Sequence, residues 1–194
     1  MVGQANAAFI IRTEVVTTSP GAGPVNVGVF ATSSTNLLLG GYDIPVNFGA
    51  AGVTPLPAGI SYLVPTVSLI TSGSTLALIA DTTGLGDVVV SDAVTGMPPV
   101  YPPLVAGVEV KLFDLRFDVG AAAPGAQFAI APITSGHLFF NINDQLGQQF
   151  TVTNVLPGSL TIAIPEPNGF AIVGLFSSFY FSSFYFSRRR RLRT

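Results

Sequence analysis

The chain has 194 residues, of which 48% are hydrophobic and only 9% are charged, and its formal net charge is −2. Residues 1–167 carry ten acidic and three basic side chains, a net of seven negative charges, whereas residues 188–194 carry five arginines. The acidic body lacks the basic surface that binding to nucleic acid requires. The absence of cysteine excludes a disulfide framework and a thiolate metal site.

The first seven residues raise the question of export. Met1–Ala7 lacks the apolar core of a signal peptide, but Ala5-Asn6-Ala7 has the small-x-small form of a cleavage site. We therefore expect residues 1–7 to be the remnant of a signal peptide whose upstream part is missing. The alternative is a coincidence in an alanine-rich segment.

Residues 8–164 read as one domain of short strands separated by Gly, Pro, Asn and Ser turns. β-branched and aromatic residues dominate these strands, and no helical period is sustained before the C-terminal segment. Such a pattern predicts an all-β fold, a β-sandwich of jelly-roll or Greek-key type with about 9–11 strands. The expected strands are Ala8–Thr17, Val25–Ala31, Leu37–Phe48, Thr66–Ile70, Thr75–Ala80, Asp87–Ser91, Gly107–Val119, Ala126–Ala131, His137–Ile142, Gln148–Val155 and Ser159–Ile164.

Three of these segments carry more detailed expectations. Pro45 within Leu37–Phe48 should lie on an edge strand or at a bulge, because proline cannot donate to a sheet ladder. In Gly107–Val119 the apolar alternation shifts by one residue at Leu112–Phe113, which predicts a bulge or a crossing between sheets. Met97–Pro103, with the sequence MPPVYPP, should be a rigid polyproline-like connector.

Two segments resemble the cohesin family of β-sandwich modules. Leu39–Gly49 (LGGYDIPVNFG) and Leu112–Ile130 (LFDLRFDVGAAAPGAQFAI) are similar to an early and a late strand of cohesins in character and in spacing. The resemblance covers about residues 12–133 and implies a noncovalent face that binds a protein or a glycan. It assigns no contact residues in this chain.

Candidate catalytic and metal-binding groups are few. His137 is the only histidine, and its place between a turn and a strand is typical of a surface residue. Asp81–Asp87 and Asn141–Asp144 offer oxygen atoms to calcium but lack the spacing of a known calcium loop, and Asp, Asn and Gly form turns without an ion. Nothing selects a carboxylate pair for glycoside hydrolysis among the ten acids. We therefore expect no enzyme activity, cofactor or metal.

The end of the chain has three parts in a fixed order. Pro165-Glu166-Pro167 is followed by the uncharged run Gly169–Ser187, and then by a cluster of arginines: Arg188, Arg189, Arg190, Arg191 and Arg193. As a helix with a rise of about 1.5 Å per residue, the run would span roughly 28 Å, close to the thickness of the bilayer core. Arginine at such a boundary stays cytoplasmic, so the body should lie outside the cytoplasm. The alternative is an aggregation-prone pair of aromatic strands, built on the repeated SSFYF.

This order resembles the PEP-CTERM sorting signal of bacterial proteins over residues 165–193. The resemblance implies export, transient anchoring in the inner membrane, and processing by an exosortase, with Pro165, Glu166 and Pro167 as the sorting motif. An ordinary C-terminal anchor without processing is the alternative. The run departs from the family in being rich in Phe, Tyr and Ser.

The sequence thus predicts a chain in three segments, namely residues 1–7, a sandwich over 8–164, and a sorting signal over 165–194 with a transmembrane helix at 169–187. The expected function is that of a non-enzymatic cell-surface or extracellular-matrix protein of a bacterium. The alternative is a cohesin-like binding module that recognises a polysaccharide or a partner domain, and a hydrolase ranks third.

Overall fold

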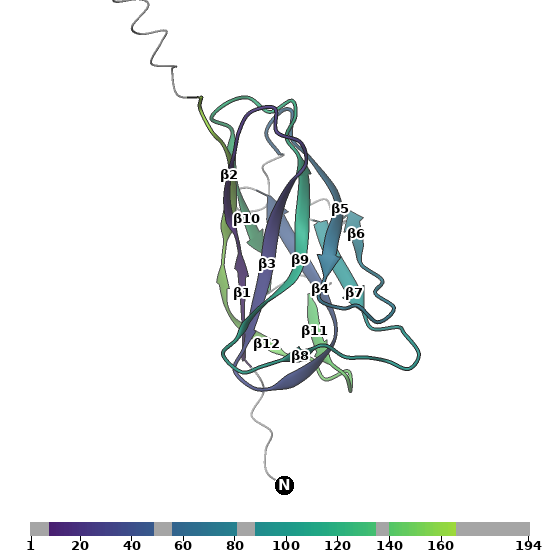
Figure 1. The fold of residues 1–194 in the computed structure, drawn as a ribbon. Helices are drawn as coiled ribbons and strands as arrows, with labels where there is room; N and C mark the ends of the chain where they lie inside the picture. Colours follow the sequence, from purple (N-terminus) through teal and green to yellow (C-terminus); the bar gives the residue numbers. More distant parts are fainter. Residues whose placement is uncertain (1–7, 49–55, 81–87, 135–139, 166–194) are drawn as a thin grey trace, which may run out of the picture. The chain divides into compact units, whose positions relative to one another are not determined.

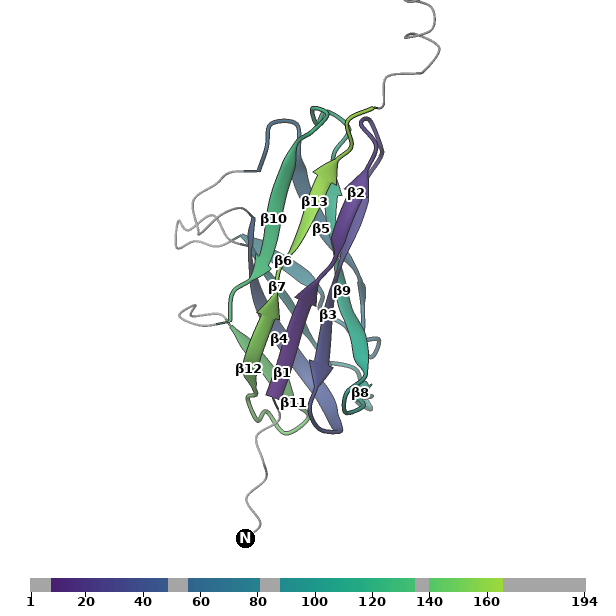
Figure 2. The same ribbon diagram turned by 90° about the vertical axis from the view of Figure 1, so that its left-hand side faces the viewer.

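The computed structural model describes residues 8–48, 56–80, 88–134 and 140–165. The chain divides into two units, Met1–Ala163 and Ile164–Thr194, and every element described lies in the first. These elements are all strands, and they form two sheets that face each other (Figures 1 and 2). The predicted all-β sandwich is confirmed, whereas the predicted helix at 169–187 lies outside the described residues.

The two sheets contain thirteen strands within the described residues. The five-stranded sheet has the order β12-β1-β3-β9-β5, with β12 at Thr151–Leu156, β1 at Ala8–Thr13, β3 at Val25–Ser33, β9 at Glu109–Asp118 and β5 at Ser61–Ser68. The eight-stranded sheet has the order β2-β13-β10-β4-β7-β6, with β2 at Val15–Thr18, β13 at Gly158–Ile162, β10 at Gln127–Pro132, β4 at Leu37–Phe48, β7 at Val88–Ala93 and β6 at Ala77–Ala80. Two short strands, β8 at Pro103–Leu104 and β11 at Asn141–Asp144, also pair with β4.

At its start and at its end, the domain's chain passes from one sheet to the other, and the two crossings lie next to each other. β1 pairs with β12 and β2 pairs with β13, both in parallel, and the chain changes sheets at Glu14 and at Pro157 (Figure 2). The crossing is tied to β3, because Glu14 N donates to Gly28 O at 2.9 Å and Gly28 N donates to Glu14 Oε2 at 3.0 Å. The single strand expected at Ala8–Thr17 is therefore split between the two sheets.

The phase shift predicted in β9 is a bulge. Val29 pairs with Phe113 and Phe30 pairs with Lys111, so Leu112 is the extra residue, and both Leu112 and Phe113 are buried. β9 remains in the five-stranded sheet throughout, which excludes the alternative of a crossing. The bulge keeps apolar side chains inside on both of its sides, because it compensates for the change in alternation.

The placement expected for Pro45 is wrong. β4 lies between β7 and β10 and is not an edge strand. The carbonyl of Pro45 accepts from Ile133 N at 2.8 Å, and the N and C=O of one residue in a strand point to the same side. The nitrogen of Pro45 therefore faces the place where the neighbour of β4 changes from β10 to β11, so that the missing donor interrupts no ladder.

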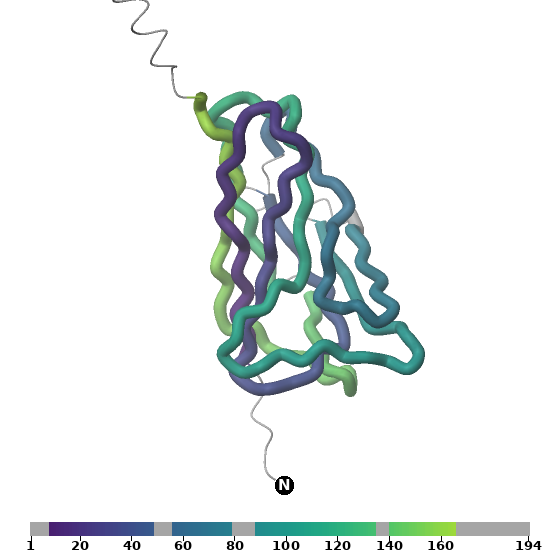
Figure 3. The backbone as a smooth tube through the Cα atoms, viewed as in Figure 1, coloured from purple at the N-terminus to yellow at the C-terminus, as the bar shows by residue number. Residues whose placement is uncertain are grey.

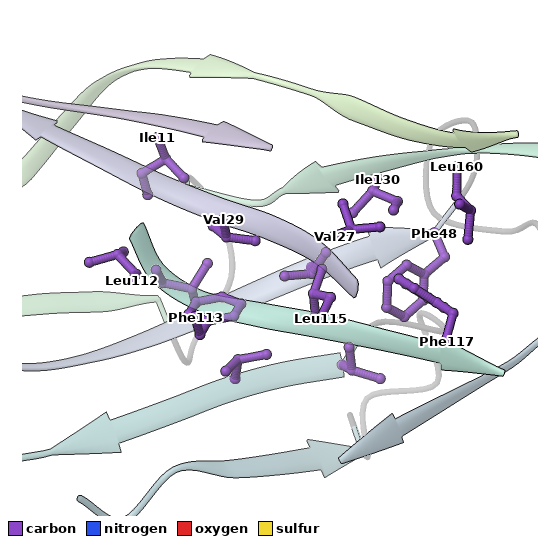
Figure 4. Close-up of a cluster of buried hydrophobic side chains, with 14 of the residues drawn as sticks. Ile11, Val27, Val29, Phe48, Leu112, Phe113, Leu115, Phe117, Ile130 and Leu160 are labelled. Carbon is purple, nitrogen blue, oxygen red and sulfur yellow. The ribbon is translucent and has the colours of Figure 1, made fainter. Parts of the chain in front are cut away.

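The core lies between the sheets and is rich in aromatic rings at one end. Phe48, Phe117 and Phe128 contact one another with centroid distances of 5.3–6.3 Å, from strands β4, β9 and β10. Figure 4 shows Phe48 and Phe117 beside Leu160, and Leu112 and Phe113 at the other end of β9. Each fully buried side chain of this size contributes about 1.5–3 kcal/mol to folding. The packing of the two inner faces thus holds the sheets together.

The crossing gives a stability prediction. A Cβ atom at Gly158 would lie 2.1 Å from the backbone oxygen of Glu14, too close for any side chain. We expect Gly158→Ala to lower the free energy of unfolding by about 1–3 kcal/mol, because the two crossing strands must separate. Urea denaturation of the full chain in a mild detergent measures the change.

Gly23→Ala is the matched control, because nothing lies within 4 Å of the added methyl group. Equal unfolding midpoints for Gly158→Ala and Gly23→Ala would contradict the close approach at the crossing.

Candidate binding face

A mixed apolar and charged surface covers the outer side of the five-stranded sheet. Inward-facing Phe9 and Ile11 alternate with outward-facing Ile10 and Arg12 on β1. Register places Arg12 beside Phe30 of β3 on one side and beside Leu156 of β12 on the other. We call this surface the Arg12 face and define it by Ile10, Arg12, Phe30, Glu109, Lys111 and Leu156.

The guanidinium of Arg12 is held in place from two directions. Its Nε and Nη2 atoms donate to Glu109 Oε1 and Oε2, at 2.7 Å each, and its Cζ lies 4.3 Å from the centroid of the Phe30 ring. Two parallel hydrogen bonds and a cation–π contact restrict the rotamers of the long side chain. Lys111 lies 5.6 Å from the same ring and pairs with Asp114 at 2.9 Å.

The ion pair shifts the pKa of both of its members, Arg12 and Glu109. The hydrogen bond from Arg12 lowers the pKa of Glu109 below its usual value of 4.5, and the hydrogen bond to Glu109 raises the pKa of Arg12. Both side chains are about one third or more exposed, so water screens most of their attraction. The pair therefore orients Arg12 more than it stabilises the fold.

The Arg12 face retains the capacity to bind. Ile10, two residues before Arg12 on β1, is 38% exposed, and Leu156, the neighbour of Arg12 on β12, is 44% exposed. A guanidinium has five N–H donors, and Glu109 occupies two of those of Arg12. Apolar side chains around a preoriented arginine are typical of protein–protein interfaces, where aromatic residues and arginine are enriched.

A different polar set lies on the outer side of the eight-stranded sheet. Asp43 of β4 is flanked in register by Ser91 of β7 and Asn141 of β11. The Oγ of Ser91 donates to Asp43 Oδ1 at 2.5 Å, and Gly41 and Ala93 are the neighbours along the strands. This Asp43 row, defined by Ser91, Asp43 and Asn141, is polar, half-buried and without charge compensation within the row.

A third polar cluster is buried between the sheets. Asp92 is 1% exposed, and its carboxylate accepts from Ser74 Oγ at 2.9 Å, from the backbone N of Thr75 at 2.7 Å, and from Ser68 Oγ. Tyr42 lies within hydrogen-bond distance of Ser68 and donates to Leu112 O at 3.3 Å, and burial raises the pKa of Tyr42. These bonds join β4 and β7 to β5 and β9, and they serve the fold because the carboxylate of Asp92 is buried and hydrogen-bonded.

One of the two segments considered for calcium, Asn141–Asp144, lies within the described residues. Asp144 Oδ1 accepts from the backbone N of Leu146 at 2.8 Å and of Gln148 at 2.9 Å, so it stabilises its own turn. Within the described ranges, no three His, Cys, Asp or Glu residues gather in a way that could hold a metal ion. Both His137 and Asp81–Asp87 lie outside those ranges.

Of the predicted sorting motif, only the first residue, Pro165, lies within the described residues. Pro165 is exposed, whereas Glu166, Pro167, Gly169–Ser187 and the five arginines lie outside the described residues. In the part of the chain that the structure covers, no helix has the length and apolar character needed to cross a membrane.

Sequence reasoning did not find the Arg12 face. Its members come from β1, β3, β9 and β12, and Arg12 and Glu109 are separated by 97 positions. One signal was available, since Arg12 is one of three basic residues in the body and interrupts an apolar strand. Its partner could not be chosen from ten acids without the sheet order.

Comparison with known proteins gives a consistent answer for the fold. No family model matches the chain, and no curated protein matches it. The sixth cohesin of scaffoldin B from Acetivibrio cellulolyticus, solved with a dockerin, is similar over 80% of this chain and 99% of that chain, with a TM-score of 0.54 and 17% identity. A type I cohesin–dockerin complex from Clostridium thermocellum gives 0.57 at 10% identity, over 80% and 99% of the two chains.

A non-cellulosomal cohesin from the archaeon Archaeoglobus fulgidus is similar over 82% of this chain and 93% of that chain, with a TM-score of 0.50 and 14% identity. The described body therefore has a cohesin-like β-sandwich fold, as the two sequence segments indicated. At these identities the likeness defines the fold alone, and a function must be argued from the residues of the site.

The ion pair of the Arg12 face predicts a pH dependence. Because the pKa of Glu109 is lower in the folded chain, its contribution to stability is present above pH 4.5 and disappears as the pH falls through the folded pKa. Glu109→Gln should lower the free energy of unfolding by less than about 1 kcal/mol at neutral pH, because both side chains are exposed. Urea denaturation at several pH values measures the difference.

A double-mutant cycle with Arg12→Gln isolates the coupling between the two side chains. A coupling that stays constant from neutral to strongly acidic pH would contradict the ion pair.

Proposed function

We propose that the sandwich is a noncovalent binding module for a partner protein domain, without enzymatic activity, and that the Arg12 face is its contact surface. The observation that carries the proposal is the cohesin-like fold, which spans nearly the full length of cohesins solved as complexes with dockerins. A partner domain of the dockerin kind is therefore the first candidate. The chain brings to such a contact a rigid sheet face, because both sheets are joined by a continuous core.

The choice of the Arg12 face over the Asp43 row rests on exposure and composition. The Arg12 face combines two exposed aliphatic side chains, an aromatic ring, and an arginine of whose five N–H groups Glu109 accepts from two. The Asp43 row is half-buried, and its carboxylate already accepts from Ser91. Burial of apolar area supplies most of the free energy of association, and oriented polar groups supply specificity.

A protein partner is favoured over a polysaccharide by the state of Phe30. A sugar ring would pack on a bare aromatic face, and the guanidinium of Arg12 lies over the ring of Phe30. Ile10 and Leu156 suit the apolar core of a protein interface better than the hydroxyl-rich surface of a glycan.

We further propose that the chain is a bacterial cell-surface or extracellular-matrix protein, delivered by its C-terminal segment. Pro165-Glu166-Pro167, the uncharged run and the arginines support export, anchoring in the inner membrane by a single helix over 169–187, and processing by an exosortase. An exposed Pro165 directly after the sandwich is compatible with access of a processing enzyme. Display outside the cytoplasm would bring the binding module to its partner.

The binding proposal is tested with the full chain in detergent, immobilised and exposed to purified dockerin domains and to soluble polysaccharides. We expect saturable binding to a dockerin domain and a loss of about 30-fold or more in affinity for Arg12→Ala, the threshold of an interface hot spot. Arg12→Lys should also weaken binding, because lysine lacks the planar donor fork.

Asp43→Ala is the matched control on the opposite sheet and should bind like the unaltered chain. Loss of binding in Asp43→Ala with none in Arg12→Ala would overturn the choice of face. Binding to a polysaccharide alone, or to neither probe, would contradict the protein-partner proposal.

The sorting proposal predicts that Glu166→Ala, or a charge in the middle of the run such as Ser178→Lys, blocks surface display. A lysine at the centre of a membrane helix costs about 2.5–3.5 kcal/mol on the insertion scale. Surface labelling and intact mass spectrometry of protein recovered from cells measure display and trimming. Thr194→Ala is the control, and unchanged display and mature mass in both Glu166→Ala and Ser178→Lys would refute the proposal.

A further inference from the structure

A second exposed apolar feature of the domain is the proline loop, Met97–Pro103, between β7 and β8. Met97 is 97% exposed and Val100 is 61% exposed, and Pro98, Pro99 and Pro103 are exposed as well. The segment projects at the lower right of Figure 3, before the chain returns to β8. No charged residue occurs between Asp92 and Glu109. A soluble loop of this composition is unusual, since exposed apolar clusters mark contact sites.

The conformation of the loop is restricted by its own sequence. Prolines at 98, 99, 102 and 103 lock φ near about −65°, and each residue before a proline is pushed to extended values. Among residues 97–103, only Val100 is free of both restrictions. No residue from 99 to 102 belongs to a helix or a strand, and the prolines favour the extended backbone of a polyproline helix.

The loop is also anchored at both ends to the sandwich. Before it, the backbone N atoms of Thr95 and Gly96 donate to Ser72 O at 3.3 and 3.2 Å. Within it, Val100 N donates to Ser72 Oγ at 3.3 Å and Leu39 N donates to Pro102 O at 3.0 Å. After it, the buried Leu104 pairs with Leu37 of β4.

Two glycines allow this attachment. A Cβ at Gly73 would lie 2.3 Å from Gly96 N, and a Cβ at Gly96 would lie 2.2 Å from Ser72 Oγ. The two backbones therefore meet at a distance that only glycine permits. The result is a proline-rich segment that is fixed to the body through Val100 and Pro102 and exposes Met97, Pro99 and Val100. A partner that binds it has little further chain entropy to remove, because folding has already ordered the segment.

We propose that the proline loop is a ligand for a partner domain with a groove lined by aromatic side chains. Such grooves bind proline-rich segments of the Pro-x-x-Pro type, because the preformed extended chain loses little entropy. Pro99-Val100-Tyr101-Pro102 has this spacing. With no charge in the loop, aromatic and proline contacts carry the recognition, and the affinity should depend little on salt. The proposal is independent of the Arg12 face, which lies on the outer side of the five-stranded sheet.

The test uses the full chain in detergent and two purified probes with aromatic-lined grooves, an SH3 domain and a WW domain. We expect saturable binding of at least one probe, a loss of about tenfold or more for Val100→Asp, and no loss for Arg12→Ala. Because Val100 is exposed, Val100→Asp should melt at the same temperature as the unaltered chain.

Leu146→Asp is the matched control, since Leu146 is 75% exposed in the turn after β11 and lies outside the loop. Equal losses for Leu146→Asp and Val100→Asp, or the failure of both probes to bind, would overturn the proposal. Sedimentation velocity tests whether a second copy of the chain covers the loop instead. A dimer that Val100→Asp converts to a monomer would show this and overturn the proposal.

Discussion

The fold depends on the joint crossing of its first and last strands between the two sheets. The chain runs from β1 in the five-stranded sheet into β2 in the eight-stranded sheet, and from β12 into β13 in the same way. The two crossings meet where Gly158 lies against the backbone of Glu14. Because each pair is parallel, its strands cannot be joined by a hairpin and must come from distant parts of the chain. The first and last strands of the domain therefore close the same side of the sandwich, and the other strands of each sheet extend away from that side.

That closure explains where the polar groups of the domain lie. Between the sheets, the carboxylate of Asp92 is met by several donors, from Ser68, Ser74 and the backbone of Thr75, which offset the cost of its burial. On the outside, the same sheets present charges that water can reach, and there Arg12 and Glu109 pair across Phe30. The first set stabilises the assembly of the sheets. The second leaves the fold little changed and orients groups for contact with another molecule.

The two proposed surfaces differ in what they offer to a partner. The Arg12 face belongs to four strands, so its shape follows from the sheet. The proline loop is a projecting segment whose shape follows from four prolines and from its attachments to Ser72 and Leu39. A module of this kind could receive one partner on its sheet while serving as the ligand of another. Anchoring by the C-terminal segment would hold both contacts at a membrane or a cell surface.

Much of the architecture follows from local patterns in the sequence. Local patterns predicted an all-β sandwich, the strand at Leu37–Phe48, and a bulge or a crossing at Leu112–Phe113, and the structure confirms the first two and shows the bulge. These features depend on residues that are neighbours in the chain, where a period of two is readable. The order of Pro-Glu-Pro, apolar run and arginines is likewise a property of the sequence alone, and the sorting role inferred from it remains a prediction.

The tertiary structure decided the rest. It split the first strand at Glu14, placed Pro45 in a central strand beside the break between β10 and β11, and brought Arg12 to Glu109. Each of these outcomes depends on which strand lies beside which. That order is set by packing among residues far apart in the chain, and no local period records it.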